Sequence, residues 1–69
     1  MTLDEYNQRM TQIHKELETI AQRTLNQALL GVADSSNEMF VELMQRHAQL
    51  TKLSSEITEA MIAMMKTSQ

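Results

Sequence analysis

The chain has 69 residues, a formal net charge of -3, and neither cysteine nor proline. A domain this small buries only about 60% of the surface that its unfolded chain exposes, so it is marginally stable unless it is cross-linked, binds a metal or oligomerises. Without cysteine no disulfide can form, and no Cys/His cluster indicates structural zinc. We therefore expect residues 1–69 to form a single small domain that gains stability by association.

Charge and hydropathy argue against binding to nucleic acid and against insertion into a membrane. The six Lys and Arg residues are scattered along the chain rather than gathered into a basic stripe. No run of 18 apolar residues is present. The N-terminus is acidic and lacks the apolar segment of a signal peptide, and the absence of cysteine fits a reducing compartment. We expect a cytoplasmic protein, with export that needs no cleaved signal as the alternative.

An amphipathic helix is predicted over residues 3–30. Thr2 and Glu5 have the spacing of a capping box, in which the Thr2 hydroxyl accepts a hydrogen bond from the Glu5 amide. Apolar residues then recur at alternating intervals of three and four, which is typical of a helix packed along its length against another helix. The core seam predicted for this helix comprises Leu3, Tyr6, Met10, Ile13, Leu17 and Ile20.

The seam is expected to shift near the end of this helix, because the strict repeat after Ile20 falls on the polar residues Thr24 and Gln27. Such a shift relaxes supercoiling. The apolar row is then predicted to move to Ala21, Leu25, Ala28 and Val32, with Leu25 in the core. Gly31, the only glycine, is a suitable C-cap in the left-handed region, so the helix is expected to end before it.

A second helix is predicted over residues 36–66. Ser35 and Glu38 form another capping-box pattern, with Asp34 and Ser36 as rival N-caps. Glu42 and Arg46 are expected to pair across one helical turn. The predicted core row of this helix comprises Leu43, Leu50, Ile57 and Met64, seven residues apart, with Phe40 beside it. Because the two helices have similar lengths and the turn over residues 31–35 is short, we predict an all-α antiparallel hairpin.

The second helix has an additional apolar stripe that one neighbouring helix cannot cover. Residues 60–65 are apolar on every side, and a helix of this kind is expected to be buried on every side. Methionine is frequent here, and its flexible side chain adapts to the surface of another helix. We therefore predict a partner-binding surface that comprises Val41, Met44, Ala48, Met61, Ile62 and Met65.

No residue pattern predicts catalysis, a cofactor or a metal site. The chain has no cysteine nucleophile and no Gly-rich phosphate loop, and helix capping accounts for the polar residues 34–37. His14 and Glu18 share one helix face, but two ligands make a weak metal site, and a solvated histidine is the expected role. His47 is expected at the edge of the seam, where it reaches solvent; a pH switch is the alternative. We do not expect an enzyme.

The sequence resembles one known family over the stretch from Leu29 to Ile57. This stretch starts with a Leu-Leu-Gly turn and continues into a helix whose matching residues are Phe40, Leu43, Gln45, Gln49, Leu50 and Leu53. In this pattern the chain is similar to the small cochaperones of type III secretion needle subunits. The resemblance implies a helical hairpin that joins a helical-repeat chaperone and keeps the needle subunit monomeric in the bacterial cytoplasm. The Met-rich C-terminal end departs from those proteins.

Two other interaction roles fit the same residues. Two copies of the hairpin would form a homodimeric four-helix bundle that acts as an adaptor or regulator, and the regular seam supports this. A secreted needle or inner-rod subunit is also a helical hairpin, although this chain lacks a proline-containing turn. In each of these roles the chain binds helices.

Overall fold

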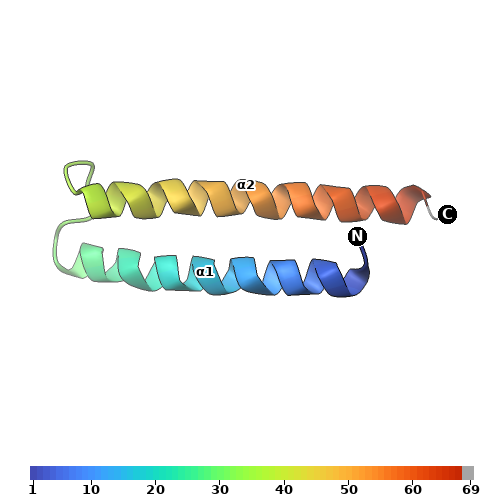
Figure 1. Ribbon diagram of the computed structural model, residues 1–69. Helices are drawn as coiled ribbons and strands as arrows, with labels where there is room; N and C mark the ends of the chain where they lie inside the picture. The colour runs from blue at the N-terminus through green and yellow to red at the C-terminus, as the bar shows by residue number, and fades with distance from the viewer. Residues whose placement is uncertain (68–69) are drawn as a thin grey trace.

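The protein is an antiparallel pair of long helices, which confirms the all-α hairpin predicted from the sequence. The computed structural model describes residues 1–67, in which α1 spans Leu3–Leu29 and α2 spans Glu38–Thr67. Figure 1 shows the two helices side by side, with the N-terminus next to the C-terminal part of α2. The molecule is elongated and measures 52 Å by 18 Å by 12 Å.

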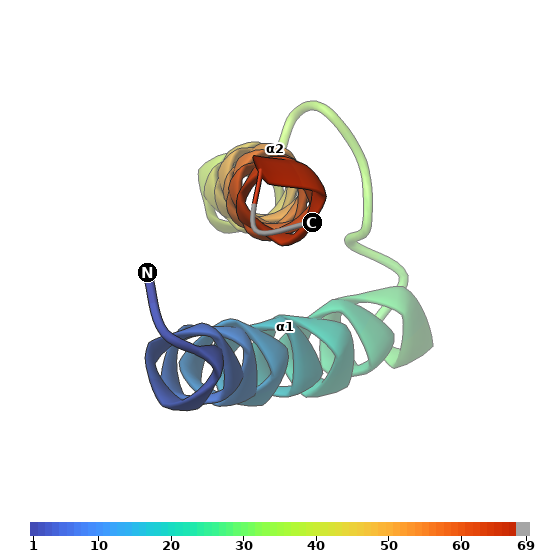
Figure 2. The ribbon, with the colours of Figure 1, turned by 90° about the vertical axis from the view of Figure 1, so that its right-hand side faces the viewer.

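One row of side chains from each helix forms the core. The buried side chains are Ile13, Ile20, Leu43, Leu50 and Ile57. The apolar side chains partly buried against them are Met1, Tyr6, Met10, Leu17 and Met44. Figure 2, viewed nearly along α2, shows α1 crossing beneath α2 at an angle. The core is therefore a single strip, because each helix turns only one stripe of side chains toward the other.

Three residues predicted for the core are exposed instead: Leu3, Leu25 and Met64. A straight helix drifts by about 20° per heptad relative to a strict 3.5-residue repeat, so the ends of a long row rotate out of the interface. This drift accounts for Leu3 and Met64. At Leu25 the expected shift of the row does not occur, and Thr24 and Gln27 remain half-buried in the seam.

The start of α1 is capped as predicted. The Thr2 hydroxyl accepts a hydrogen bond from the Glu5 amide at 3.1 Å. Asp4 and Glu5 occupy the first turn, where their negative charge stabilises the positive end of the helix dipole. These interactions are local to the first turn of α1 and involve no residue of α2.

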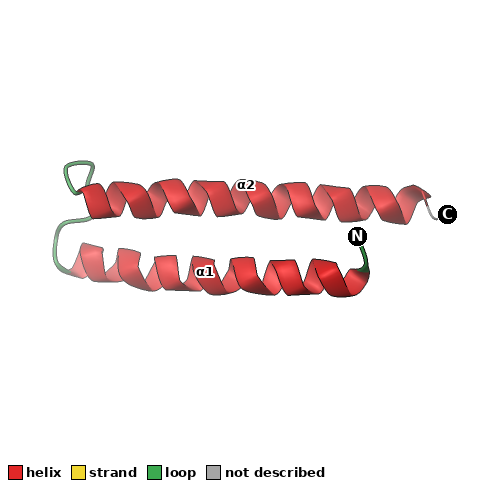
Figure 3. Ribbon diagram, viewed as in Figure 1, coloured by secondary structure: helices red, strands yellow, loops and turns green. Residues whose placement is uncertain are grey.

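The end of α1 is a Schellman motif centred on Gly31. Its φ of +74° lies in the left-handed region that glycine adopts without strain. The Gly31 amide donates to the Ala28 carbonyl at 3.0 Å, and the Val32 amide donates to the Gln27 carbonyl at 2.9 Å. These bonds satisfy two carbonyls that the end of a helix leaves unpaired. The chain then leaves the helix axis as the loop seen in Figure 3.

The start of α2 differs from the prediction, because the N-cap is Asn37 rather than Ser35, Asp34 or Ser36. Asn37 Oδ1 accepts a hydrogen bond from the Met39 amide at 3.2 Å. Asp34 instead closes a turn within the loop, where its Oδ1 accepts from the Ser36 amide at 2.9 Å. The helix therefore begins at Glu38, two residues later than predicted, and the connection is longer than residues 31–35.

Asn37 differs from the other capping residues because its side chain can accept through Oδ1 while the two N–H groups of Nδ2 donate. While Oδ1 caps α2, Nδ2 donates to the Val32 carbonyl at 2.9 Å and also to Gln27 Oε1. A serine or aspartate at this position has no second donor. Asn37 thus forms hydrogen bonds with residues at the end of α1, in the loop and at the start of α2.

Candidate helix-binding face

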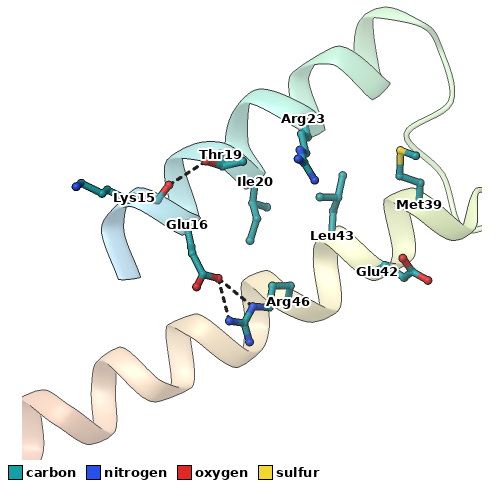
Figure 4. A pocket seen from close by; sticks show the side chains of 9 residues that line it. All are labelled: Lys15, Glu16, Thr19, Ile20, Arg23, Met39, Glu42, Leu43 and Arg46. Atoms are coloured by element: carbon teal, nitrogen blue, oxygen red, sulfur yellow. Dashed lines mark hydrogen bonds and ion pairs between the residues drawn. The ribbon is translucent and has the colours of Figure 1, made fainter. Parts of the chain in front are cut away.

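Among the grooves beside the seam, two are lined in part by Ile20 and differ in chemistry. The first groove is rich in charge. The charged residues that line it are Lys15, Glu16, Arg23, Glu42 and Arg46. Figure 4 shows Glu16 and Arg46 meeting beside Ile20 and Arg23 near Leu43, while Lys15 points away from these apolar side chains. This side of the hairpin is therefore suited to contact with water.

Arg46 pairs across this groove with Glu16 of α1, and not with Glu42 as predicted. Its Nε and Nη2 donate to Glu16 Oε2 at 3.1 Å and 2.9 Å, as Figure 4 shows. Both side chains are half-exposed, so the pair contributes less than about 1 kcal/mol to stability. Its main consequence is geometric, because it ties the middle of α1 to the middle of α2 on one side of the seam.

The second groove, on the other side of Ile20, contains no charged residue. It is lined by Ile20, Ala21, Thr24, Leu25, Ala28, Met44 and His47. The two polar residues in this set are Thr24 and His47. The groove therefore differs from its counterpart in chemistry although both lie against the same core residue.

Helical spacing extends this uncharged surface along the whole hairpin. Residues three, four and seven apart share one face of a helix. Continuing from the groove in both directions gives Leu3, Met10, His14, Leu17, Ala21, Thr24, Leu25 and Ala28 on α1, and Phe40, Met44, His47, Thr51, Ser54, Thr58, Ile62 and Met65 on α2. We call this set the charge-free face, since none of its members is Lys, Arg, Asp or Glu. By the same spacing Glu18 lies beside His14 at its edge on α1, and Glu59 and Lys66 flank Ile62 at its edge on α2. The charged face is the opposite side, on which Glu16 and Arg46 pair.

Two side-chain contacts connect the helices on the charge-free face. Ser54 Oγ donates to Met10 Sδ at 3.9 Å, and the Tyr6 and Thr58 hydroxyls lie 3.4 Å apart. The Thr24 hydroxyl oxygen, by contrast, is buried without a hydrogen-bond partner within residues 1–67. A buried hydroxyl without a partner is destabilising. The hairpin alone therefore leaves apolar side chains of this face exposed to water and the buried Thr24 hydroxyl without a hydrogen-bond partner within residues 1–67.

The residues predicted to bind a partner do not all lie on this face. Met44 lies on it and is half-buried against the core, and Ile62 and Met65 lie on it and are exposed. Val41 lines a different groove with Ser35, Glu38 and Glu42. Ala48 is exposed at the edge of the charge-free face, and Met61 is half-buried in the seam. The residues of the predicted stripe therefore lie on different sides of the hairpin, because of the rotation of α2 about its own axis.

The charge-free face also includes residues of α1, none of which was predicted to bind a partner. Leu25 is 59% exposed and Ile62 is 46% exposed, so the two helices contribute exposed leucine and isoleucine side chains at opposite ends of the same surface. The signal that would have identified α1 is the lack of charge at Ala21, Leu25 and Ala28, which the sequence analysis assigned to a shifted core. Lack of charge alone does not distinguish a core from a docking surface.

Among the titratable groups, Asp34 has a structural role in the loop between the helices. The Ser36 hydroxyl donates to Asp34 Oδ1, as does the Ser36 amide, and these bonds hold the pKa of Asp34 below its ordinary value. His14 and His47 are exposed. Within residues 1–67, no group of three or more His, Cys, Asp or Glu residues is arranged to hold a metal ion.

Comparison with protein-family models, curated proteins and solved structures finds no match for this chain. Neither α1 nor α2, the helices of the described residues, is long and apolar enough to cross a membrane. The features on which a function can be built are therefore those of the fold itself: an antiparallel helical hairpin with one charged face and one charge-free face.

Proposed function

We propose that this protein is a non-enzymatic helical interaction protein that supplies two helices to a bundle completed by another chain. The single observation that supports this most strongly is the charge-free face, which runs the length of both helices. In such a bundle the partner helices lie in the groove beside Ile20 and along the face. The charged face remains in water.

The energetics of the hairpin support the need for a partner. Within residues 1–67 only five side chains are buried, and full burial of a large apolar side chain contributes about 1.5–3 kcal/mol. Ordering each residue costs roughly 1.5 kcal/mol. A second helical layer on the charge-free face would bury Leu25, Ile62 and Met65, which the hairpin leaves exposed.

The resemblance to type III secretion cochaperones gives this proposal a specific form. In that form, the completing chain is a helical-repeat chaperone, a needle subunit or both, and the complex forms in the bacterial cytoplasm. A subunit that polymerises through amphipathic helices must have those helices covered until export. An uncharged face about 40 Å long is suited to cover such a helix, because each helical residue rises about 1.5 Å.

A titration with a model peptide tests the general proposal. The probe is a fluorescein-labelled amphipathic peptide in which Leu recurs at intervals of three and four, with equal numbers of Lys and Glu elsewhere. We expect fluorescence anisotropy to show binding that Ile62→Asp weakens at least about tenfold. Leu53→Asp is the matched control, because Leu53 is 44% exposed, lies on α2 and faces the other side. No binding, or equal loss in both variants, would contradict the proposal.

A further inference from the structure

We infer that Met65 is an oxidation site of the charge-free face, at which hydrogen peroxide converts the thioether to a sulfoxide and thereby weakens helix binding. This inference rests on the proposed function, because it names a regulation of the same face. Two observations support it: the exposure of Met65 compared with that of the other methionines, and its position on α2.

The methionines of this chain differ in how far solvent reaches them. Met10 and Met44 belong to the charge-free face, but both are half-buried against the core. Met39 and Met65 are each 57% exposed, and Met64 is 42% exposed. Peroxide dissolved in water therefore has access to these three sulfurs in the folded hairpin, whereas packing restricts its access to the first two. Among the exposed methionines of residues 1–67, only Met65 belongs to the charge-free face.

The position of Met65 on α2 aligns it with the uncharged groove. Met65 lies 18 residues, or five turns, after His47, which lines that groove, and it follows Ile62 by three residues. Met39, by contrast, lines the charged groove together with Arg46. Oxidation of Met65 therefore changes the surface proposed to receive a helix, and oxidation of Met39 changes the opposite side.

The reaction transfers one oxygen atom from hydrogen peroxide to sulfur. A lone pair of Met65 Sδ attacks one peroxide oxygen, so that the S–O bond forms as the O–O bond breaks. The departing hydroxide takes the proton of the transferred hydroxyl group and leaves as water. Sulfur loses two electrons, and the peroxide gains two. A flexible apolar side chain thereby becomes a polar one.

The sulfoxide acts on binding rather than on the fold. Because Met65 is exposed in the hairpin alone, its sulfoxide oxygen remains hydrated and α2 is expected to stay helical. When an apolar helix covers the face, that oxygen loses its water and meets no donor, which is unfavourable. Oxidation is therefore expected to raise the dissociation constant of the peptide complex at least about fivefold.

Limited peroxide treatment of the full chain, followed by titration with the fluorescein-labelled model peptide, tests this inference. Catalase removes residual peroxide before the titration, and the probe, made of Leu, Lys and Glu, has no sulfur to oxidise. Tandem mass spectrometry assigns the sulfoxides, and we expect Met39 and Met65 to be oxidised before Met10 and Met44. Circular dichroism verifies that the treated chain is helical.

Two variants separate the two faces, each compared with its own untreated protein. Met39→Leu is the matched control, because Met39 has the same exposed fraction as Met65 but lies on the charged face. It should lose binding on treatment as the wild type does. Met65→Leu offers no sulfur at the proposed site, so treatment should change its dissociation constant by less than about twofold.

Three results would overturn the inference while leaving the proposed function intact. They are a Met65 that stays unoxidised while Met10 and Met44 react, a chain oxidised at Met65 that binds as tightly as before, and an equal loss of binding in Met65→Leu and Met39→Leu. An untreated chain that does not bind the peptide contradicts the proposed function and, with it, the regulation inferred here. The two failures therefore give different results.

Discussion

Replacement of Leu50 by aspartate is the most informative test of the fold. Leu50 is only 2% exposed, the lowest fraction among the buried core side chains. Removing a buried leucine costs about 2–5 kcal/mol, with values near the lower end where the surroundings can collapse, as they can in a two-helix structure. Burying an unpaired carboxylate adds several kcal/mol more. A chain of this length has roughly 3–10 kcal/mol of stability in total, so Leu50→Asp is expected to unfold the hairpin.

Leu53→Asp provides the control for this prediction. It introduces the same charge three residues later on α2, at a side chain that is 44% exposed. The carboxylate there remains in water, so the expected cost is only about 1 kcal/mol. Circular dichroism at matched concentration should show loss of helix for Leu50→Asp and retention for Leu53→Asp. A Leu50→Asp protein as helical and as resistant to urea as Leu53→Asp would refute the placement of the core.

Three further predictions concern the connection between the helices. Gly31→Ala is expected to lower the free energy of unfolding by about 1–2 kcal/mol, because the backbone there has φ of +74° although no atom crowds the position of the new Cβ. In urea unfolding, Asn37→Ala is expected to cost about 1–2 kcal/mol through loss of the cap, and Asn37→Asp less. Since the pKa of Asp34 is lowered in the folded chain, its stabilising effect exists above the ordinary value of 3.8 and is lost as the pH falls through the folded value.

Each of these predictions has a result that would contradict it. For Gly31, an alanine variant as stable as the wild type would mean that the Schellman geometry does not limit the turn. For Asn37, equal losses in the alanine and aspartate variants would mean that the donated bonds, rather than the cap, determine its contribution. For Asp34, the comparison is with Asp34→Asn in thermal unfolding between about pH 5 and about pH 2.5. A difference between the two proteins that stays constant over this range would contradict the assigned titration.

The sequence predicted the helices well because their signals are local and repeated. Alternating intervals of three and four specify a packed helix regardless of what packs against it, and a single glycine marks the end of α1. The N-cap of α2 was harder to predict, because Asp34, Ser35, Ser36 and Asn37 all have side chains that cap helices. The choice among them depends on tertiary contacts, since Asn37 also donates to Gln27 in α1.

The residues predicted to bind a partner lie on more than one side of the hairpin, and the reason is the rotation of α2 about its own axis. A sequence pattern identifies which residues share a face of one helix, but it does not specify how far that helix is turned in the hairpin. Thr24 and Gln27 remain in the seam of the structure, so Leu25 is displaced from the expected core to the charge-free face. The same rotation separates Val41 from Met44 on α2.

Thiol accessibility measures most directly whether the charge-free face is the one that becomes covered. The chain contains no cysteine, so a single engineered thiol reports on its own position alone. We predict that the thiol of Leu25→Cys reacts more slowly with an aromatic disulfide reagent as the concentration of the amphipathic model peptide rises through its binding range. The thiol of Leu53→Cys, on the charged face, should react at a constant rate. Equal behaviour of the two thiols, or protection of Leu53→Cys alone, would contradict the central claim that the charge-free face is the binding surface.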